Sequence, residues 1–485
     1  INSGKKFEIA AGKKLSVNGS ITNSAGSDGF ILNSDATGTA SIVHNSDNIA
    51  ATAERYISGN AEDWHFLSSP VENQEISGSW LPAGTYGNGT GYDLYLWNEA
   101  TSCWIYKLNT TSPVNWNTAN PGTDFVAGRG YLYAVEALNP TKEFSGNLNN
   151  GTISYGLTYA SDTASLKGFN LVGNPYPSSI DWMAASGWTR DILQTNGGGK
   201  DMWIWNQEAN NYGVYNSADA SGTGTNSVTR YIAPMQGYFV RASSAGSLSM
   251  DNDVRVHDGA DSWLKQSMLE MSKVSVCIKS DDGFGSDEIR LNFGYDSNEN
   301  GARKLFSSVL SAPSLYMTTR ADNLSVQYLT NTEENPVIPV SFIPGATGDY
   351  TIRCHFDVNK FEVVMLEDCK THAIQNMKSK NTHSFTANKT DNTERFILHF
   401  GAVDGDFGKQ LPARIYTDEN NLIVDLTLVT KETTVTVCDL LGRVLLRKEY
   451  MGETVHNVTL HSSKQMLIIY LDNPNGTLSR KIFWK

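Results

Sequence analysis

Apolar residues along this chain recur mainly at every second position, in short runs separated by Gly, Asn, Ser and Pro. The run 273–279 (KVSVCIK) is typical, with Val, Val and Ile alternating with other residues. Such a period belongs to half-buried β-strands, and little of the sequence has the helical period of about 3.6 residues. The pattern predicts an all-β chain, with one modest helix near 180–193.

The most informative feature is an internal duplication between about residues 60 and 257. Three blocks recur in order, at offsets of 105, 108 and 107 residues: WHFLSSP at 64–70 with FNLVGNP at 169–175, DLYLWN at 93–98 with DMWIWN at 201–206, and GYLY at 130–133 with GYFV at 237–240. Each copy predicts an apolar strand ending at Pro, an aromatic alternating strand and a strand entered through Gly. The copies form either two sandwiches or the halves of one pseudo-symmetric domain.

The rest of the chain predicts further β modules. The expected fold is a tandem of β-sandwiches with an immunoglobulin-like member and a β-solenoid-like or edge-strand start. The predicted units are the solenoid-like segment 1–58, the duplicated aromatic-rich region 59–257 with copies at about 60–155 and 166–257, the immunoglobulin-like sandwich 268–402, and a small C-terminal sandwich at 410–485.

The charge balance narrows the classes of partner. The chain has 38 basic and 51 acidic residues, a formal net charge of -13. A negative surface repels phosphate backbones and anionic lipid, so we expect no nucleic-acid partner. No apolar run approaches the ~18 residues that span a bilayer, so no membrane-spanning segment is expected. Because the chain starts at Ile1 and not at Met, we expect that a segment upstream has been removed.

The C-terminal residues carry a family resemblance. The stretch 435–444 (VTVCDLLGRV), the apolar strand near 467–471 and the basic end 480–485 resemble the C-terminal sorting domain of type IX secretion in Bacteroidetes. The family usually has Gly before its last apolar strand, and this chain has Gln465 at the start of that strand, so the domain is either an export signal or a retained structural domain. The stretches 169–182 and 232–240 resemble regions of large surface proteins of the same bacteria. The resemblance implies export to the outer cell surface or beyond, and implies no particular ligand.

Candidate chemical motifs are few. The stretch 296–301 (DSNENG) has the start of a calcium loop, but Ser307 occupies the twelfth position, where a bidentate Glu is expected, so a solvated turn is the favoured interpretation. The pairs Asp281–Asp282 and Asp251–Asp253 lie in polar, turn-like stretches without the apolar wall that raises a catalytic pKa. No catalytic, cofactor-binding or metal-binding residue is therefore predicted, and no cofactor.

The five cysteines show no CxxC spacing, and the favoured interpretation is that they are small buried hydrophobes. A disulfide between Cys354 and Cys369 is the alternative, because they would lie on neighbouring strands. Nine of the 11 Trp lie between 64 and 205, and sugar stacking on exposed rings is the alternative to a role for these rings in the core. Trp97, Trp203 and Trp205 recur in the duplicated strand and are expected in the core, whereas Trp104 and Trp116 would be the exposed platforms.

These observations predict a non-enzymatic exported protein of the cell surface or extracellular space, with a structural or adhesive role and an unknown surface protein or glycan as partner. The alternative is a carbohydrate-binding component of a secreted glycan-utilisation system. Exposed, coplanar aromatic rings in one groove would favour the alternative, and burial of the Trp side chains would remove its basis. An enzyme would need a deep pocket with convergent carboxylates or histidines.

Overall fold

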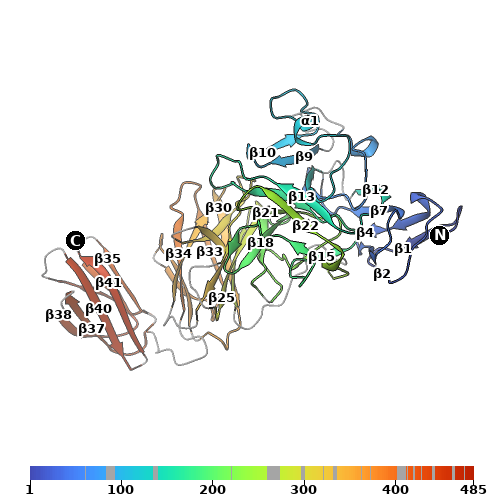
Figure 1. The fold of residues 1–485 in the computed structure, drawn as a ribbon. Coiled ribbons are helices and arrows are strands. Elements are labelled where there is room, and N and C mark those ends of the chain that lie inside the picture. The colour runs from blue at the N-terminus through green and yellow to red at the C-terminus, as the bar shows by residue number, and fades with distance from the viewer. Residues whose placement is uncertain are drawn as a thin grey trace.

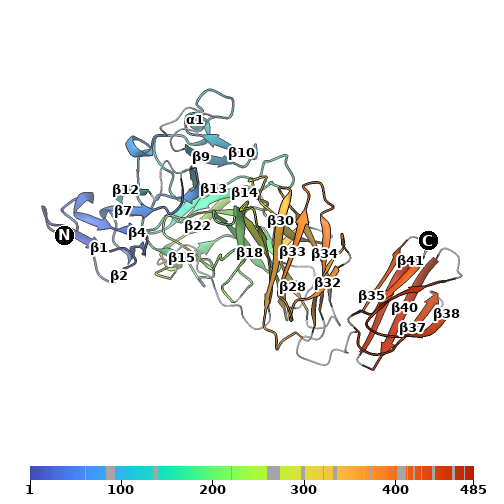
Figure 2. The same ribbon diagram turned by 180° about the vertical axis from the view of Figure 1, so that it is seen from behind.

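The structure is a computed structural model. It describes residues 1–485 apart from 61, 83–92, 135–139, 220, 259–272, 296–300, 320–321, 331–335, 362, 372, 401–410, 412, 419–420, 428, 440–442, 461–464, 475 and 485. The described residues are mostly strands, with α1 (Trp116–Ala119) as the single α-helix among them, so the predicted all-β class is confirmed. The N-terminal strands and the C-terminal unit lie at opposite ends of the molecule (Figures 1 and 2).

The first 58 residues form parallel β rungs. Strands β1 (Phe7–Ile9), β3 (Phe30–Leu32) and β7 (Ala50–Tyr56) lie side by side in parallel, and β2 (Lys14–Val17) pairs in parallel with β6 (Ser41–His44). Short strands stacked in this way without helical crossovers are the arrangement of a β-solenoid. The last rung, β7, also pairs antiparallel with β12 (Thr141–Asn147), so the segment is both solenoid-like and an edge of the region that follows.

The duplicated blocks form two sheets of the same strand order. The first sheet is β10-β9-β11-β8, formed by β8 (Trp64–Leu67), β9 (Asp93–Asn98), β10 (Cys103–Tyr106) and β11 (Tyr131–Ala134). The second has the order β19-β18-β21-β14, formed by β14 (Phe169–Gly173), β18 (Gly199–Asn206), β19 (Asn211–Asn216) and β21 (Gly237–Arg241). The register is also the same: Tyr131 opposes Leu67 in the first copy, and Tyr238 opposes Val172 in the second.

The two copies pack on each other with pseudo-twofold symmetry. The Ser68 N–H donates to the Met235 carbonyl at 3.0 Å, and the equivalent Gly173 N–H donates to the Gly128 carbonyl at 2.9 Å. Between the sheets, the Phe66 ring lies edge-on to Phe239, with centroids 5.7 Å apart. The copies are therefore halves of one pseudo-symmetric unit, which decides between the two arrangements that the sequence leaves open.

The predicted helix near 180–193 is wrong. This stretch contains β15 (Ser179–Asp181) and β16 (Trp188–Thr189), separated by turns. Gly187 has a φ of +87°, a left-handed conformation that interrupts a right-handed helix. Trp182 and Trp188 pack edge-to-face inside the second copy, so burial of aromatic rings outweighs the weak helical pattern.

Short strands and turns complete residues 1–258. Strands β13 (Ile153–Leu157) and β16 flank β22 (Gly246–Met250), and β20 (Tyr231–Ile232) and β23 (Arg255–Val256) flank β15. The remaining elements are β4 (Ser34–Asp35), β5 (Gly38–Thr39), β17 (Thr195–Asn196) and the 3₁₀ turns η1 (Ser27–Gly29), η2 (Gly78–Trp80) and η3 (Asn252–Val254).

Residues 273–400 form two β layers around one core. One layer contains β24 (Lys273–Ser280), β25 (Ser286–Phe293), β26 (Gly301–Arg303), β28 (Asn323–Leu329), β30 (Gly348–Phe356) and β33 (Thr382–Ala387). The other contains β27 (Ser314–Thr318), β29 (Val337–Ile343), β31 (Val364–Asp368), β32 (Ala373–Asn376) and β34 (Glu394–Phe400). The layers are continuous through β27, which pairs with both β28 and β29, and the pair β25–β28 is parallel.

This sandwich is joined to the second copy by buried contacts. The Trp203 indole N–H donates to the Arg303 carbonyl at 3.0 Å, and the Asn211 amide donates to the Pro313 carbonyl at 2.8 Å. The Lys273 ammonium pairs with Asp219 at 2.9 Å, with both side chains nearly excluded from solvent. Polar groups satisfied at a buried junction fix the orientation of the two parts.

The C-terminal residues form a separate unit with its own core. Its sheets are β35 (Arg414–Asp418), β36 (Asn421–Asp425) and β39 (Val455–Val458), and β37 (Thr433–Asp439), β38 (Val444–Tyr450), β40 (Gln465–Asn473) and β41 (Gly476–Trp484). Strands β37 and β38 pair antiparallel across residues 440–442, as a hairpin does. The core between the sheets includes Ile415, Val437 and Ile469.

Candidate functional site

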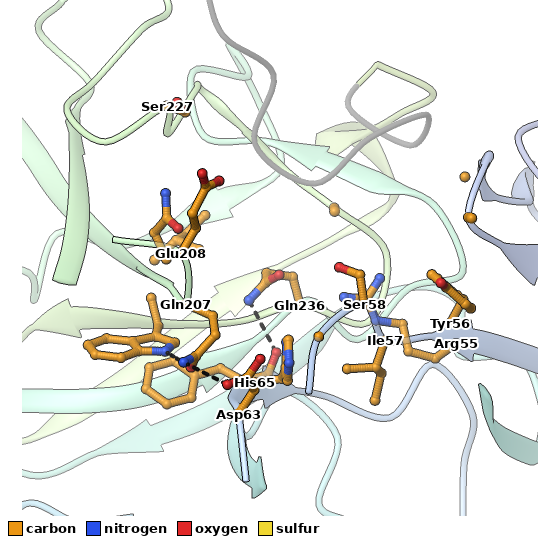
Figure 3. Close-up of a pocket in the computed structure, with 18 of the residues that line it drawn as sticks. Arg55, Tyr56, Ile57, Ser58, Asp63, His65, Gln207, Glu208, Ser227 and Gln236 are labelled. Carbon is orange, nitrogen blue, oxygen red and sulfur yellow. Dashed lines mark hydrogen bonds between the residues drawn. The ribbon is translucent and has the colours of Figure 1, made fainter. Parts of the chain in front are cut away.

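A cleft of about 1040 Å³ lies where the solenoid-like rungs meet the duplicated region. Three separate parts of the chain line it (Figure 3): the end of the rungs at 35–60, the start of the first copy at 63–66, and the second copy at 204–236, with Asp258 beside them. Clefts between structural units are a usual place for ligand sites.

A hydrogen-bonded group of side chains forms one wall of the cleft (Figure 3). The side-chain oxygen of Gln207, Oε1, accepts from the Trp205 indole N–H at 3.0 Å and from the Trp64 backbone N–H at 2.8 Å. The Gln207 amide donates to Asp63 Oδ1 at 3.2 Å, and Asp63 Oδ2 accepts from the Asn60 N–H at 2.8 Å. The two copies and the rungs therefore hold these polar groups in place before any ligand arrives.

The back of the cleft lies at the pseudo-twofold contact. The Gln236 amide donates to the Phe66 carbonyl at 3.1 Å and to the Gly237 carbonyl at 2.7 Å. On the opposite side, Ser227 has a φ of 66°, a left-handed conformation that is unusual for a residue other than Gly (Figure 3). Held backbone strain of this kind concentrates at functional sites.

The ionisable groups give the cleft a negative character. Four carboxylates line it, those of Asp35, Asp63, Glu208 and Asp258, against the guanidinium of Arg55. A hydrogen bond from the Thr37 hydroxyl, followed by one from the Thr37 N–H, lowers the pKa of Asp35, which therefore stays ionised. Burial, followed by the charge of Arg55, lowers the pKa of His65 to about 3, so its imidazole is neutral at physiological pH.

His65 is poorly suited to act as a catalytic base in this cleft. A catalytic base works best with a pKa near the operating pH, and that of His65 lies far below it. Within the part of the chain that the structure describes, His, Cys, Asp and Glu side chains nowhere gather in the threes that a metal ion needs. Among the same residues, there is no helix of the length and apolar character required to cross a membrane.

The predicted aromatic platforms are wrong. Trp116 is 0% exposed and packs against Tyr131, because the short helix α1 turns its ring inward. Trp104 is half-buried and contacts Phe66, Trp97 and Phe239 between the two sheets. The interpretation of Trp203 and Trp205 as core residues is confirmed, since they are 1% and 6% exposed.

The other candidate residues do not converge on a site. Residues 296–300 of the calcium-loop motif lie outside the described residues, and Gly301 begins β26. Asp251 caps the turn η3, where its side chain accepts the Asp253 N–H at 2.9 Å. All five cysteines are unpaired, so Cys354 and Cys369 do not form a disulfide.

Sequence reasoning missed the residues of the cleft. Asp63 and Gln207 are 144 positions apart, and neither lies in a recognisable motif. The one available signal is the duplication itself, because it places the start of the first copy beside the second.

Comparisons with known proteins give a family without a described activity. Residues 1–400 match the model of a family described as "Domain of unknown function (DUF8693)". No curated protein matches the chain. A solved structure titled "Biofilm associated protein - BSP domain" is 12% identical, with 97% of this chain and 99% of that chain covered and a TM-score of 0.16. Another, titled "Crystal structure of tetra-tandem repeat in extending region of large adhesion protein", is 10% identical, with coverages of 90% and 100% and a TM-score of 0.12. Scores this low carry no argument about fold or function.

Proposed function

Because the chain belongs to the family described as Domain of unknown function (DUF8693), its activity has to be sought in its own structure, and we propose that it is a non-enzymatic, exported adhesive protein. It acts at the outer cell surface or in the extracellular space, where it binds a surface protein or glycan. The observation that carries this proposal is a preformed cleft between modules that buried contacts hold together.

Rigidity is the physical basis of the adhesive role. The rungs join the first copy through β7 and β12, the copies join each other at the pseudo-twofold contact, and the second copy joins the sandwich through Trp203 and Arg303. A binding site whose walls are already ordered spends less of its interaction energy on ordering.

The C-terminal unit supports export. Its β37–β38 hairpin carries the stretch 435–444 on which the resemblance to the type IX sorting domain of Bacteroidetes rests. The unit has a core of its own, so it can fold independently of the rest. We assign it the role of an export signal.

The alternative function, carbohydrate binding, cannot be argued from exposed Trp rings. Among the described residues no Trp is exposed, so stacking platforms give no support to a carbohydrate-binding component of a glycan-utilisation system. The lining of the cleft is the feature that bears on glycan binding.

Surface location and adhesion are tested in the source organism. Intact cells are treated with a protease, and the chain is followed by immunoblotting beside a cytoplasmic marker. We expect cleavage of the chain but not of the marker, retention inside the cell when 410–485 are deleted, and weaker attachment of cells that lack the chain. Full protection of the chain in intact cells would contradict the proposal.

A further inference from the structure

We infer that the cleft between the rungs and the second copy binds a neutral oligosaccharide. This inference rests on the proposed adhesive function and names the ligand class of its site. It differs from a site on exposed Trp rings, because the recognising groups are the hydrogen-bonded side chains around Asp63 and Gln207.

Charge excludes the anionic ligands first. The carboxylates of Asp35, Asp63, Glu208 and Asp258 outnumber the single guanidinium of Arg55, and His65 is neutral. Phosphate, sulfate and uronate groups are therefore repelled. A ligand of this cleft is neutral or cationic.

The state of the carboxylates favours hydroxyl groups over a cation. Asp63 already accepts hydrogen bonds from the Asn60 N–H and the Gln207 amide, and Asp35 accepts from the Thr37 N–H at 2.7 Å. Their charge is partly compensated by these donors, while carboxylates keep lone pairs for further bonds. Sugar hydroxyls donate to such oxygens and accept from amides, and the exposed side chain of Asn60 supplies an amide in the cleft.

The aromatic rings that line the cleft and the volume of the cleft also suit an oligosaccharide. The half-buried rings of Tyr56 and Tyr231 line the cleft, and apolar ring faces pack on the C–H faces of sugars. The buried Trp205 ring donates its indole N–H to the side chain of Gln207 and so holds that side chain in one orientation. The volume of about 1040 Å³ lies just above the ~300–1,000 Å³ range of small-molecule sites, so the cleft has room for more than one sugar ring.

The test is a screen of the purified 485-residue chain on an array of neutral, sulfated and uronate glycans. Hits are titrated against its tryptophan fluorescence, and oligolysine serves as the cationic probe. Two variants alter the cleft: Asn60→Ala removes one exposed amide, and Ser58→Trp places a bulky ring on the exposed rim. Asn18→Ala is the matched control, an exposed amide of the same segment that lies outside the cleft.

We expect a saturable neutral glycan whose affinity falls tenfold or more in both cleft variants and is unchanged in Asn18→Ala. Binding that survives Ser58→Trp, a preference for oligolysine or for anionic glycans, or no hit at all would overturn the inference. Circular dichroism of each variant identifies a folding failure, in which case Glu208→Gln replaces it. Beads coated with the unaltered chain are compared in adhesion with beads coated with either cleft variant. Equal adhesion would refute this inference alone. Protection of the chain from protease in intact cells would refute the proposed function.

Discussion

Lys304 and Asp287 form an ion pair whose side chains are 1% and 0% exposed, at the junction between the second copy and the sandwich. Asp287 also accepts from the Leu315 N–H at 2.7 Å and from the Asn226 amide at 3.2 Å. Charges removed from water in this way are tolerated only with such partners. The pair therefore links the stability of the sandwich to the position of the second copy.

Asp287→Asn is expected to lower the free energy of unfolding by about 3–5 kcal/mol, because it leaves the Lys304 ammonium buried without a counter-charge. Urea denaturation of the full chain measures the change. Glu8→Gln is the matched control, since it breaks an ion pair with Lys6 that is open to solvent, and no measurable change is expected. Equal behaviour of the two variants would show that the junction does not contribute to stability.

The contribution of His44 to the stability of the folded chain is expected to fall as the pH drops from about 6.5 to about 4. Burial, followed by the charge of Arg255, lowers the pKa of His44 to about 4, whereas an unfolded imidazole titrates near 6.5. In this range the unfolded chain binds a proton that the folded chain does not, so each such histidine costs up to about 1.4 kcal/mol per pH unit. Denaturation curves at several pH values should show a shallower dependence in His44→Gln. His456→Gln in the C-terminal unit should leave the transition of residues 1–400 unchanged.

Replacing the glycines at the pseudo-twofold contact by any larger residue is expected to destabilise the protein. A methyl group on Gly130 would lie 2.5 Å from the Val172 carbonyl oxygen, and one on the equivalent Gly237 would lie 2.8 Å from the Phe66 Cβ. Gly130→Ala and Gly237→Ala should each destabilise the protein by about 1–3 kcal/mol, measured as a lower midpoint of thermal or urea unfolding. Gly156→Ala, which meets no atom within 4 Å, is the control and should be neutral. A neutral Gly130→Ala would mean that the copies do not approach each other this closely.

The cysteines should differ sharply in reactivity. Cys103 is exposed, whereas burial, followed by the charge of Glu288, raises the pKa of Cys277 to about 12. A thiol reagent should therefore modify Cys103 fast in the native chain, and Cys103→Ser should abolish that phase. After denaturation without reductant, five thiols should titrate. A count of three reactive thiols would instead show that two cysteines form a disulfide.

The duplication shows how far the sequence predicts this fold. The blocks that start at 64, 93 and 130 and their repeats form strands at equivalent positions in the two sheets. The alternation of apolar and polar residues in these blocks also fixes which face of each strand is buried. The packing of the copies was not predictable, since it depends on contacts such as Ser68 with Met235 between distant segments. The prediction for Trp116 fails for a related reason: polar neighbours in the sequence indicate exposure, but the tertiary fold buries the ring.

The cleft is the part that the sequence does not reveal. Its polar residues come from turns and strand ends, and each is ordinary in its own neighbourhood. Asp63, Gln207 and Gln236 gain their arrangement only when the rungs and both copies are assembled. The local pattern of apolar and polar residues carries no information on contacts between segments that are far apart in the sequence.

The pseudo-twofold contact between the copies has a consequence for the behaviour of the chain at low concentration. Two separate chains held by these contacts would come apart on dilution, because their association follows mass action. Here the partners are tethered within a single polypeptide, so each sees the other at an effective concentration that the surrounding volume cannot change. The aromatic surface between them consequently stays covered at any dilution of the chain.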